Sequence, residues 1–212
     1  MDKTQAFTGS DSGRRGTVSI ASIKEGKREL IVRAAIQIFS QKGYHKARME
    51  EIAVAAGIGK GTIYEYFASK LQLLQEILDQ SFHLYHDCLQ ADISQSSSFE
   101  DKIRLLLEGH FRFCQENKDL TRLLFWDAEV IDEELKEWAM ETRREKEKRL
   151  HDMISAAISS GEIRDFDPQY LTVIIGGVFG AIWAPVVVDG WQVDAAEAAR
   201  HITDLIMGGL RP

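Results

Sequence analysis

The stretch GIGKGTIYEYF, from Gly57 to Phe67, raises the question that decides the fold of this 212-residue chain. Three glycines, a lysine and a threonine in so short a segment are typical of loops that wrap a phosphate. That phosphate belongs either to a nucleotide in an active site or to the backbone of a DNA duplex. The flanking sequence distinguishes the two alternatives.

A nucleotide-binding loop is disfavoured by the order of the residues. The phosphate loop of nucleotide-binding enzymes has the pattern GxxxxGK[ST] and lies between a β-strand and a helix. Here Lys60 is followed by Gly61 rather than by serine or threonine. The preceding segment has helical periodicity, and we find no convincing strand pattern in the sequence.

Two short helices joined by a turn fit the stretch better. Apolar spacing predicts helices over residues 49–56 and 60–67, with Gly57-Ile58-Gly59 between them. A glycine at position 57 permits the positive φ that often ends a helix. Ile58 can turn inward and hold the two helices together.

The second of these helices has two distinct faces. Ile63 and Phe67 are spaced to be buried, whereas Lys60 and Tyr64 share the opposite face with Gly61. Because Gly61 has no side chain, the backbone there can approach DNA closely. We therefore expect a helix-turn-helix whose outer face enters the major groove.

The whole chain predicts an all-α protein. It is 44% hydrophobic and 28% charged, as in globular proteins, and helix-forming residues dominate. Start signals are expected in a capping box from Ser22 to Glu25 and at Ser69, Ser98, Asp132, Asp167 and Asp194; stop signals are expected at Gly43, Gly57, Gly161 and Gly208. The resulting helices, about nine in number, span roughly residues 23–41, 49–56, 60–67, 69–89, 99–116, 119–126, 132–160, 168–188 and 194–207.

The segment AAIQIFSQKGYHKARMEEIAVAAGIGKGTIYEYFASKLQLLQEIL closely resembles the N-terminal domain of the TetR family of transcriptional repressors. The matching positions are Phe39, Gly43, Tyr44, Ile52, Ala53, Ala56, Gly57, Gly61, Thr62, Ile63, Tyr64, Phe67, Ser69, Lys70 and Leu73. The resemblance covers about residues 27–80, and beyond it only the helix layout is similar. It implies a homodimer that binds a near-palindromic operator in double-stranded DNA and responds to a small molecule.

The resemblance also implies individual DNA contacts. Positions that approach base edges correspond to Lys60 and Gly61, and positions that contact mainly the backbone correspond to Thr62, Tyr64, Tyr66 and Lys70. For Tyr66 the alternative is packing, and for Lys60 and Lys70 it is an ordinary solvated lysine.

Two departures from the family pattern affect these contacts. Many members have Thr-Thr where this chain has Ala47-Arg48, and Arg48 cannot cap a helix as threonine does, although it can pair with a phosphate. Many members also have an aromatic residue in place of Glu65. A carboxylate there repels phosphate or accepts a hydrogen bond from cytosine N4, and the sequence leaves both alternatives open.

Charge divides the chain into regions with different partners. Residues 1–80 carry a net charge of +3, and residues 81–212 carry −10. We expect a flexible tail over residues 1–22, a DNA-binding domain over residues 23–68, and a ligand-binding and dimerisation domain over residues 69–212.

An uncharged segment of 18 residues runs from Leu171 to Val188. This length reaches the lower limit for a membrane span, but three glycines, a proline and the absence of a flanking basic cluster disfavour that interpretation. We expect no membrane contact and a helix buried on all sides instead. Gly176 and Gly180, four residues apart, would allow close approach of a second helix, and in the resembled family the last two helices of each subunit form the dimer interface.

The second region is rich in aromatic residues, which favours an apolar effector pocket, with ordinary core packing as the alternative. The candidate lining residues are His110, Phe111, Arg122, Trp126, Phe179 and Trp183. The net charge of −10 disfavours a highly anionic effector unless a local basic site compensates. We interpret residues 141–149 as a solvated helix face with pairs such as Glu145 and Arg149.

Two other function classes compete with an effector-responsive repressor. A ligand-independent DNA-binding protein would not need so large an aromatic second region. A nucleotide-using enzyme would need one of the catalytic motifs, and the sequence has no such motif. Cys88 and Cys114 lack metal-ligand spacing, so we expect no metal or cofactor, and the two cysteines fit a reduced cytoplasm.

Overall fold

A computed structural model describes residues 26–90, 93, 96, 98–124 and 133–211. Those residues form nine α-helices and no strand, which confirms the all-α prediction. The helices are α1 (Lys27–Lys42), α2 (Met49–Ala55), α3 (Lys60–Tyr66), α4 (Lys70–Gln90), α5 (Phe99–Glu116), α6 (Lys118–Arg122), α7 (Glu133–Ser159), α8 (Pro168–Val187) and α9 (Ala195–Leu210). The predicted tail lies outside the described residues.

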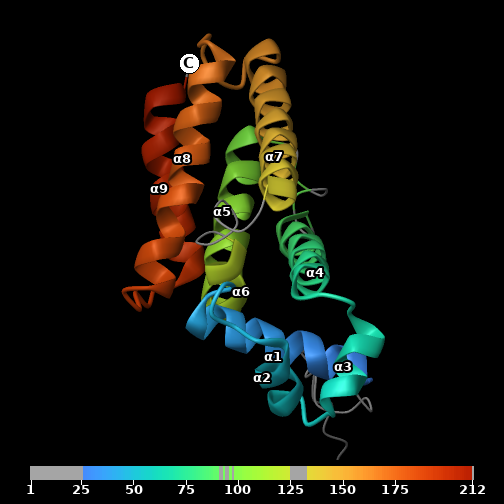
Figure 1. Ribbon diagram of the computed structural model, residues 1–212. Coiled ribbons are helices and arrows are strands. Elements are labelled where there is room, and N and C mark those ends of the chain that lie inside the picture. The colour runs from blue at the N-terminus through green and yellow to red at the C-terminus, as the bar shows by residue number, and fades with distance from the viewer. Residues whose placement is uncertain (1–25, 91–92, 94–95, 97, 125–132, 212) are drawn as a thin grey trace, which may run out of the picture.

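The helices are arranged in two parts joined by α4 (Figure 1). The short helices α2 and α3 lie with α1 at one end of the molecule, and α4 leads from them into the larger part. There α5 packs against α4, α8 and α9, and α7 packs mainly against α8. The element that leaves the helix-turn-helix is therefore also a wall of the second part.

Local signals place most helix ends correctly. The Ser98 hydroxyl accepts a hydrogen bond from the Asp101 amide at 3.1 Å, and the Asp194 carboxylate accepts one from the Glu197 amide at 2.8 Å. Gly43 and Gly161 follow α1 and α7, and each has φ of 75°, a positive angle that glycine adopts more readily than other residues.

Two predicted helix ends differ from the structure. Helix α1 is capped by Gly26, whose amide donates to Glu29 at 2.8 Å, while the expected box from Ser22 to Glu25 lies outside the described residues. Helix α9 continues past the predicted stop at Gly208 as far as Leu210. Leu210 is buried, and its carbonyl accepts from the Arg164 amide, so tertiary contacts hold a turn that glycine alone would leave weak.

Two apolar clusters form the core. The first combines the inner faces of α1, α2, α3 and α4 and continues through α4 to Phe113, Leu123 and Leu124. The second lies among α5, α7, α8 and α9. The bidentate pair between Arg28 on α1 and Glu76 on α4 reinforces the first cluster from its surface. The apolar packing around the helix-turn-helix therefore extends beyond residue 68.

Helix α8 corrects one expectation. It is long and apolar enough to span a membrane by length and composition alone. It is not buried on all sides of the subunit, because Tyr170, Val173 and Ile174 are 71, 64 and 59% exposed. Its other face is packed in the second cluster, through residues such as Ile175 and Val186. Periodicity detects an apolar helix but cannot tell whether its second face meets the same chain or another.

Candidate DNA-binding and effector sites

The predicted helix-turn-helix is present with the expected turn. Helix α2 ends near Gly57, which has φ of 68°, and the Ile58 amide donates to the Ala53 carbonyl at 3.0 Å. Ile63 and Phe67 are fully buried in the first cluster. These anchors fix the rotation of α3 about its axis, so the opposite face must point outward.

The outer face of α3 presents Lys60, Gly61, Tyr64 and Glu65 to solvent. The Lys60 ammonium lies 2.8 Å from a carboxylate oxygen of Glu50, at the start of α2. This hydrogen bond raises the pKa of Lys60 and lowers the pKa of Glu50. Because both side chains are largely exposed, the pair orients Lys60 without removing it from water.

Three other candidates lie around this face. Arg48 is exposed at the N-cap of α2 and makes no side-chain capping bond, as expected from its replacement of threonine. Thr62 is half-buried on α3. Tyr66 is also half-buried and packs against the first cluster, so part of its ring has a structural role.

Lys70 makes contacts within the subunit that its interpretation as a DNA contact did not include. Its ammonium donates to the carbonyls of Tyr44, His45 and Ala47 at 2.6, 3.3 and 3.0 Å, and lies 4.3 Å from the centre of the Tyr44 ring. Partial burial lowers its pKa. An ammonium has three N–H donors, and all three serve the connection between α1 and α2. Sequence spacing cannot reveal this, because that connection lies more than twenty residues earlier.

One effector candidate, His110, lies in a buried series of hydrogen bonds that links three helices. His110 on α5 is fully buried; its Nδ1 lies 2.8 Å from the Tyr85 hydroxyl on α4, and its Nε2 lies 3.0 Å from the Phe179 carbonyl on α8. The carbonyl can only accept, so Nε2 carries the proton and Nδ1 accepts from the tyrosine. Burial lowers the pKa of His110 to about 4, so the ring is neutral near pH 7.

The remaining effector candidates differ in burial and in the helices that they connect. Phe111 is fully buried, whereas Phe179 and Trp183 are half-buried beside the second cluster. Arg122 on α6 donates to the Val187 carbonyl at 3.3 Å and so ties α6 to the end of α8. Trp126 lies outside the described residues. His110, Phe179 and Trp183 lie near the meeting of α5 and α8.

The segment over residues 141–149 is mostly exposed on α7, as predicted, but its ion pairs differ from the expected ones. Arg143 pairs with Glu147, and Lys148 pairs with Asp152, as exposed i, i+4 neighbours. Arg149 instead contacts His86 on α4, and Lys146 also turns toward α4. The charge pattern of the sequence could not reveal these contacts with α4, because they depend on how α7 is rotated against α4.

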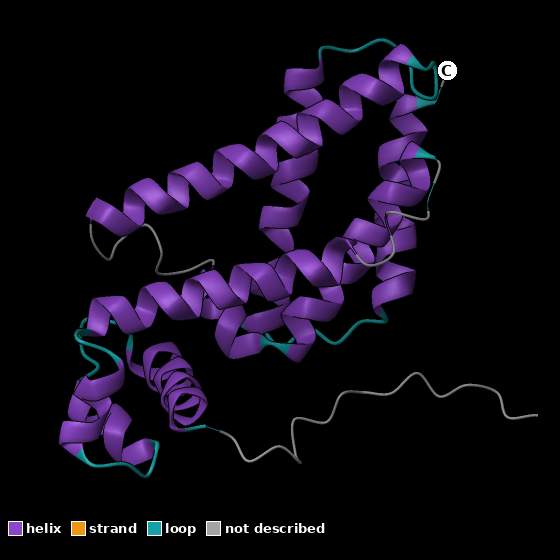
Figure 2. Cartoon of the chain, turned by 90° about the vertical axis from the view of Figure 1, so that its right-hand side faces the viewer, coloured by secondary structure: helices purple, strands orange, loops and turns teal. Residues whose placement is uncertain are grey.

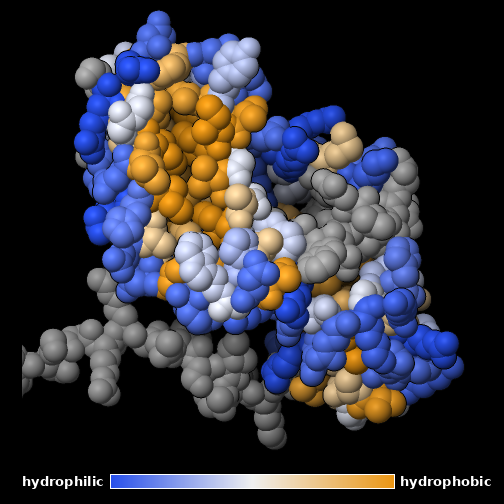
Figure 3. All heavy atoms as spheres, turned by 90° about the vertical axis from the view of Figure 1, so that its left-hand side faces the viewer, coloured by the Kyte–Doolittle hydropathy of each residue, from blue (hydrophilic) through white to orange (hydrophobic). Residues whose placement is uncertain are grey.

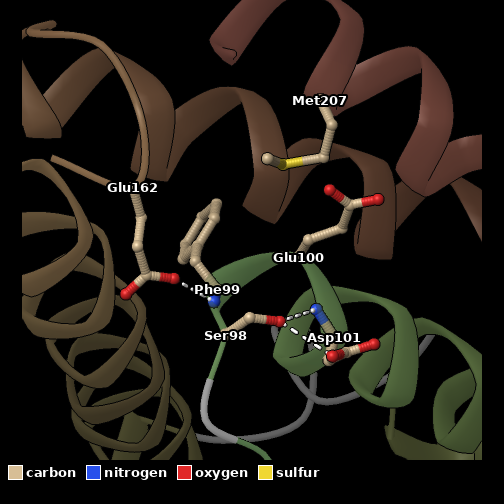
Figure 4. A pocket seen from close by; sticks show the side chains of 6 residues that line it. All are labelled: Ser98, Phe99, Glu100, Asp101, Glu162 and Met207. Atoms are coloured by element: carbon tan, nitrogen blue, oxygen red, sulfur yellow. Dashed lines mark hydrogen bonds between the residues drawn. The ribbon is translucent and has the colours of Figure 1, made fainter. Parts of the chain in front are cut away.

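A pocket of about 420 Å³ lies at the start of α5, between the turn after α7 and helix α9 (Figure 4). Its lining residues are Ser98, Phe99, Glu100, Asp101, Glu162 and Met207. Glu162 already accepts a hydrogen bond from the Phe99 amide at 2.6 Å. The three carboxylates make this pocket unsuited to an anionic or fully apolar molecule, and it contains none of the predicted effector residues.

Comparison with known proteins identifies the class of protein. Residues 31–77 match the profile described as bacterial regulatory proteins, tetR family, and residues 96–210 match the tetracyclin repressor-like C-terminal domain. The chain belongs to the TetR family. It is an effector-responsive, homodimeric DNA-binding regulator and not an enzyme.

Particular relatives narrow the comparison. The fatty acid metabolism regulator protein of Bacillus subtilis is 23% identical over 188 residues, covering 88% of this chain and 97% of that protein. The crystal structure of FadR from Bacillus subtilis with stearoyl-CoA has a TM-score of 0.73 at 22% identity, over 85% of this chain and 97% of that one. The crystal structure of AibR with isovaleryl coenzyme A and operator DNA has a TM-score of 0.71 at 18% identity, and the match covers 85% of this chain and 97% of that one.

Proposed function

We propose that this protein is a cytoplasmic repressor that leaves its operator when it binds an acyl compound, of which acyl-coenzyme A is the leading class. The acyl class is suggested by the relative that regulates fatty acid metabolism and by two similarly folded proteins bound to acyl-CoA. It also agrees with the expectation of an effector with a large apolar part.

The observation that carries the DNA-binding half of this proposal is the outward face of α3. Lys60, Gly61 and Tyr64 would approach bases and backbone, and Arg48 would pair with a phosphate at the edge. Thr62 and the exposed part of Tyr66 would add backbone contacts. Lys70 is left out, because its donors hold the connection between α1 and α2.

The second subunit would bind the apolar face of α8 and α9. This face is seen as a broad hydrophobic area bordered by polar residues (Figure 3). A Cβ atom at Gly176, Gly180 or Gly208 would meet no neighbouring helix of its own subunit within 4 Å. Two copies related by a two-fold axis can cover this face mutually, and the operator would then be near-palindromic.

Effector binding would reach DNA through α4 and α6. Helix α4 begins directly after the helix-turn-helix and carries Tyr85, the partner of His110. The Ser40 hydroxyl on α1 donates to Asp119 on α6 at 2.9 Å, and α6 is tied to α8 by Arg122. A ligand that binds one arrangement of these helices better than another shifts the DNA-binding equilibrium.

An electrophoretic mobility-shift experiment tests the proposal. An operator is first selected from a library of random duplexes, and the complex is then titrated with decanoyl-CoA. We expect release of DNA together with a change in tryptophan fluorescence over the same concentration range. Trp183 lies one helical turn after Phe179 on α8 and packs against the same cluster, and the Phe179 ring contacts His110. An unchanged complex at saturating decanoyl-CoA, decanoate and decanol would exclude an acyl effector.

A further inference from the structure

Two cations of α7 point toward α4. The Lys146 ammonium lies 4.1 Å from the centre of the Phe82 ring and 5.0 Å from the centre of the Tyr85 ring. One helical turn further on, the Arg149 guanidinium donates to Nε2 of His86. Because residues three apart share a helix face, both charges lie on the side of α7 that faces Phe82, Tyr85 and His86.

Neither cation has a carboxylate partner among the described residues. Lys146 and Arg149 form no ion pair there, whereas their neighbours Arg143 and Lys148 are paired at 2.8 and 2.6 Å with carboxylates of their own helix. A carboxylate reaches Arg149 only through His86, because Asp87 lies 3.9 Å from the Nδ1 atom of His86 and not beside Arg149 itself. Within the part of the chain that the structure describes, no carboxylate therefore neutralises the two positive charges that face α4.

The position is recessed but open to water. The Lys146 side chain is exposed, yet enough protein surrounds the ammonium for burial to lower its pKa to about 8. Its charge is also close enough to His110 to lower the pKa of that buried ring. Lys146 thus marks the point where solvent meets the aromatic interior that holds Tyr85, His110 and Phe179.

The long side chains of Lys146 and Arg149 connect α7 with α4. Figure 2 shows α7 running apart from the helix that leads out of the helix-turn-helix. Cation–π contacts and a hydrogen bond to a neutral imidazole are weaker than charge-assisted bonds to carboxylate or phosphate. An anion that entered here would gain two strong partners and displace only these weaker contacts.

We propose that Lys146 and Arg149 form the anion-binding end of the effector site, for a carboxylate or phosphate group attached to an apolar chain. The chain would lie against Phe82 and Tyr85, toward the interior between α4, α5 and α7. This proposal rests on the proposed acyl effector and supplies the local basic site that the acidic second region otherwise lacks. Binding would break the contacts of Phe82, Tyr85 and His86 with α7. Helix α4, which follows the helix-turn-helix directly, would then be held less firmly against α7.

The test uses isothermal titration calorimetry on the full-length dimer with three ligands of equal chain length. Decanoyl-CoA presents phosphates, decanoate presents a carboxylate, and decanol has no charge. Lys146→Met and Arg149→Met should each weaken binding of an anionic ligand by on the order of tenfold or more, and leave decanol binding unchanged. The anionic ligand that responds identifies phosphate or carboxylate as the recognised group.

Matched variants separate charge from packing. Lys148→Met removes a charge of the same helix that is paired with Asp152, and it should bind every ligand like the unmodified protein. Lys146→Arg should restore most of the affinity that Lys146→Met loses. For the unmodified protein, affinity for the responding anion should fall with added salt, and this dependence should be smaller in both methionine variants.

The possible failures are distinguishable. If the unmodified protein bound none of the three ligands, the acyl effector itself would be refuted, and the anion site with it. If it bound decanol as tightly as both anions, or if both methionine variants bound the anions normally, the anion site would be wrong while the acyl effector stood. An equal loss of decanol binding in the variants would indicate disrupted packing and would also overturn the assignment.

Discussion

The two ends of the molecule leave different chemistry uncovered. The outer face of α3 exposes a lysine, a tyrosine and a glutamate around a glycine, whereas α8 and α9 expose large apolar side chains such as Val173 and Leu205, at 64 and 81%. The polar face can be hydrated between encounters with a charged, salt-sensitive partner. The apolar face is costly in water and suits a lasting partner.

The comparison teaches that net charge is a poor guide to either partner. The region with net positive charge exposes Lys60 already paired with Glu50. The strongly acidic region contains two cations, Lys146 and Arg149, that face α4 and have no carboxylate partner among the described residues. Which charges are available depends on their nearest neighbours. The following experiments test this contrast, beginning with the largest expected effect.

Charging the apolar face should separate the subunits. Val173→Glu and Leu205→Glu should each raise the dimer dissociation constant roughly 1000-fold, because about 2 kcal/mol of apolar burial is lost in each of two copies. Sedimentation equilibrium measures this, with Met140→Glu, an exposed apolar residue of α7, as the control. A dimer of unchanged affinity in both variants would place the interface elsewhere.

Removing side chains from the outer face of α3 should weaken DNA binding without affecting folding. Lys60→Ala or Tyr64→Ala should lower operator affinity about tenfold to 100-fold, since a base or phosphate contact contributes about 1–3 kcal/mol. Fluorescence anisotropy at moderate salt measures the affinity, and Lys148→Ala provides a distant lysine for comparison. Normal operator affinity in both variants would refute the outer face of α3 as the DNA-binding surface.

Acid should destabilise the interior around His110. Its pKa is about 4 when folded and about 6.5 when unfolded, so the unfolded state takes up a proton first as the pH falls below 6.5. Between pH 7.5 and pH 5 this should remove roughly 2 kcal/mol, at about 1.4 kcal/mol per pKa unit. Urea denaturation at fixed protein concentration measures the free energy of unfolding. This free energy should depend less on pH in His110→Gln, whereas the exposed control His83→Gln should show the same pH dependence as the unmodified protein.

Lys70 should matter for folding more than for DNA. Lys70→Met removes three hydrogen bonds to the connection between α1 and α2, which should lower the free energy of unfolding by about 1–2 kcal/mol. The salt dependence of DNA binding should stay the same in this variant. A slope smaller by about one would show instead that Lys70 meets a phosphate.

Two glycines of the helix-turn-helix should respond in opposite directions. Gly57→Ala should lower stability by about 1 kcal/mol, because φ of 68° is strained for alanine. Gly61→Ala meets open space within a helix and should raise stability by up to about 1 kcal/mol, yet it should weaken operator binding. Thermal unfolding and anisotropy together provide the measurement, and undiminished DNA affinity in Gly61→Ala would show that no close backbone approach occurs there.

The sequence by itself determined the helices and the class of protein. Caps such as Ser98 and Asp194, and stops such as Gly43 and Gly161, act between residues three or four apart, so they can be recognised without the fold. The same holds for the two faces of α3, because helical spacing places Ile63 opposite Lys60.

Only the tertiary structure decided how the buried and charged groups are used. Tyr85 and His110 are 25 residues apart, and His110 and Phe179 are 69 apart, so their hydrogen bonds depend on the packing of α4, α5 and α8. The inward turn of Lys146 and the uncovered face of α8 depend in the same way on how whole helices are rotated. Periodicity fixes which residues share a face, but helix packing determines what that face contacts.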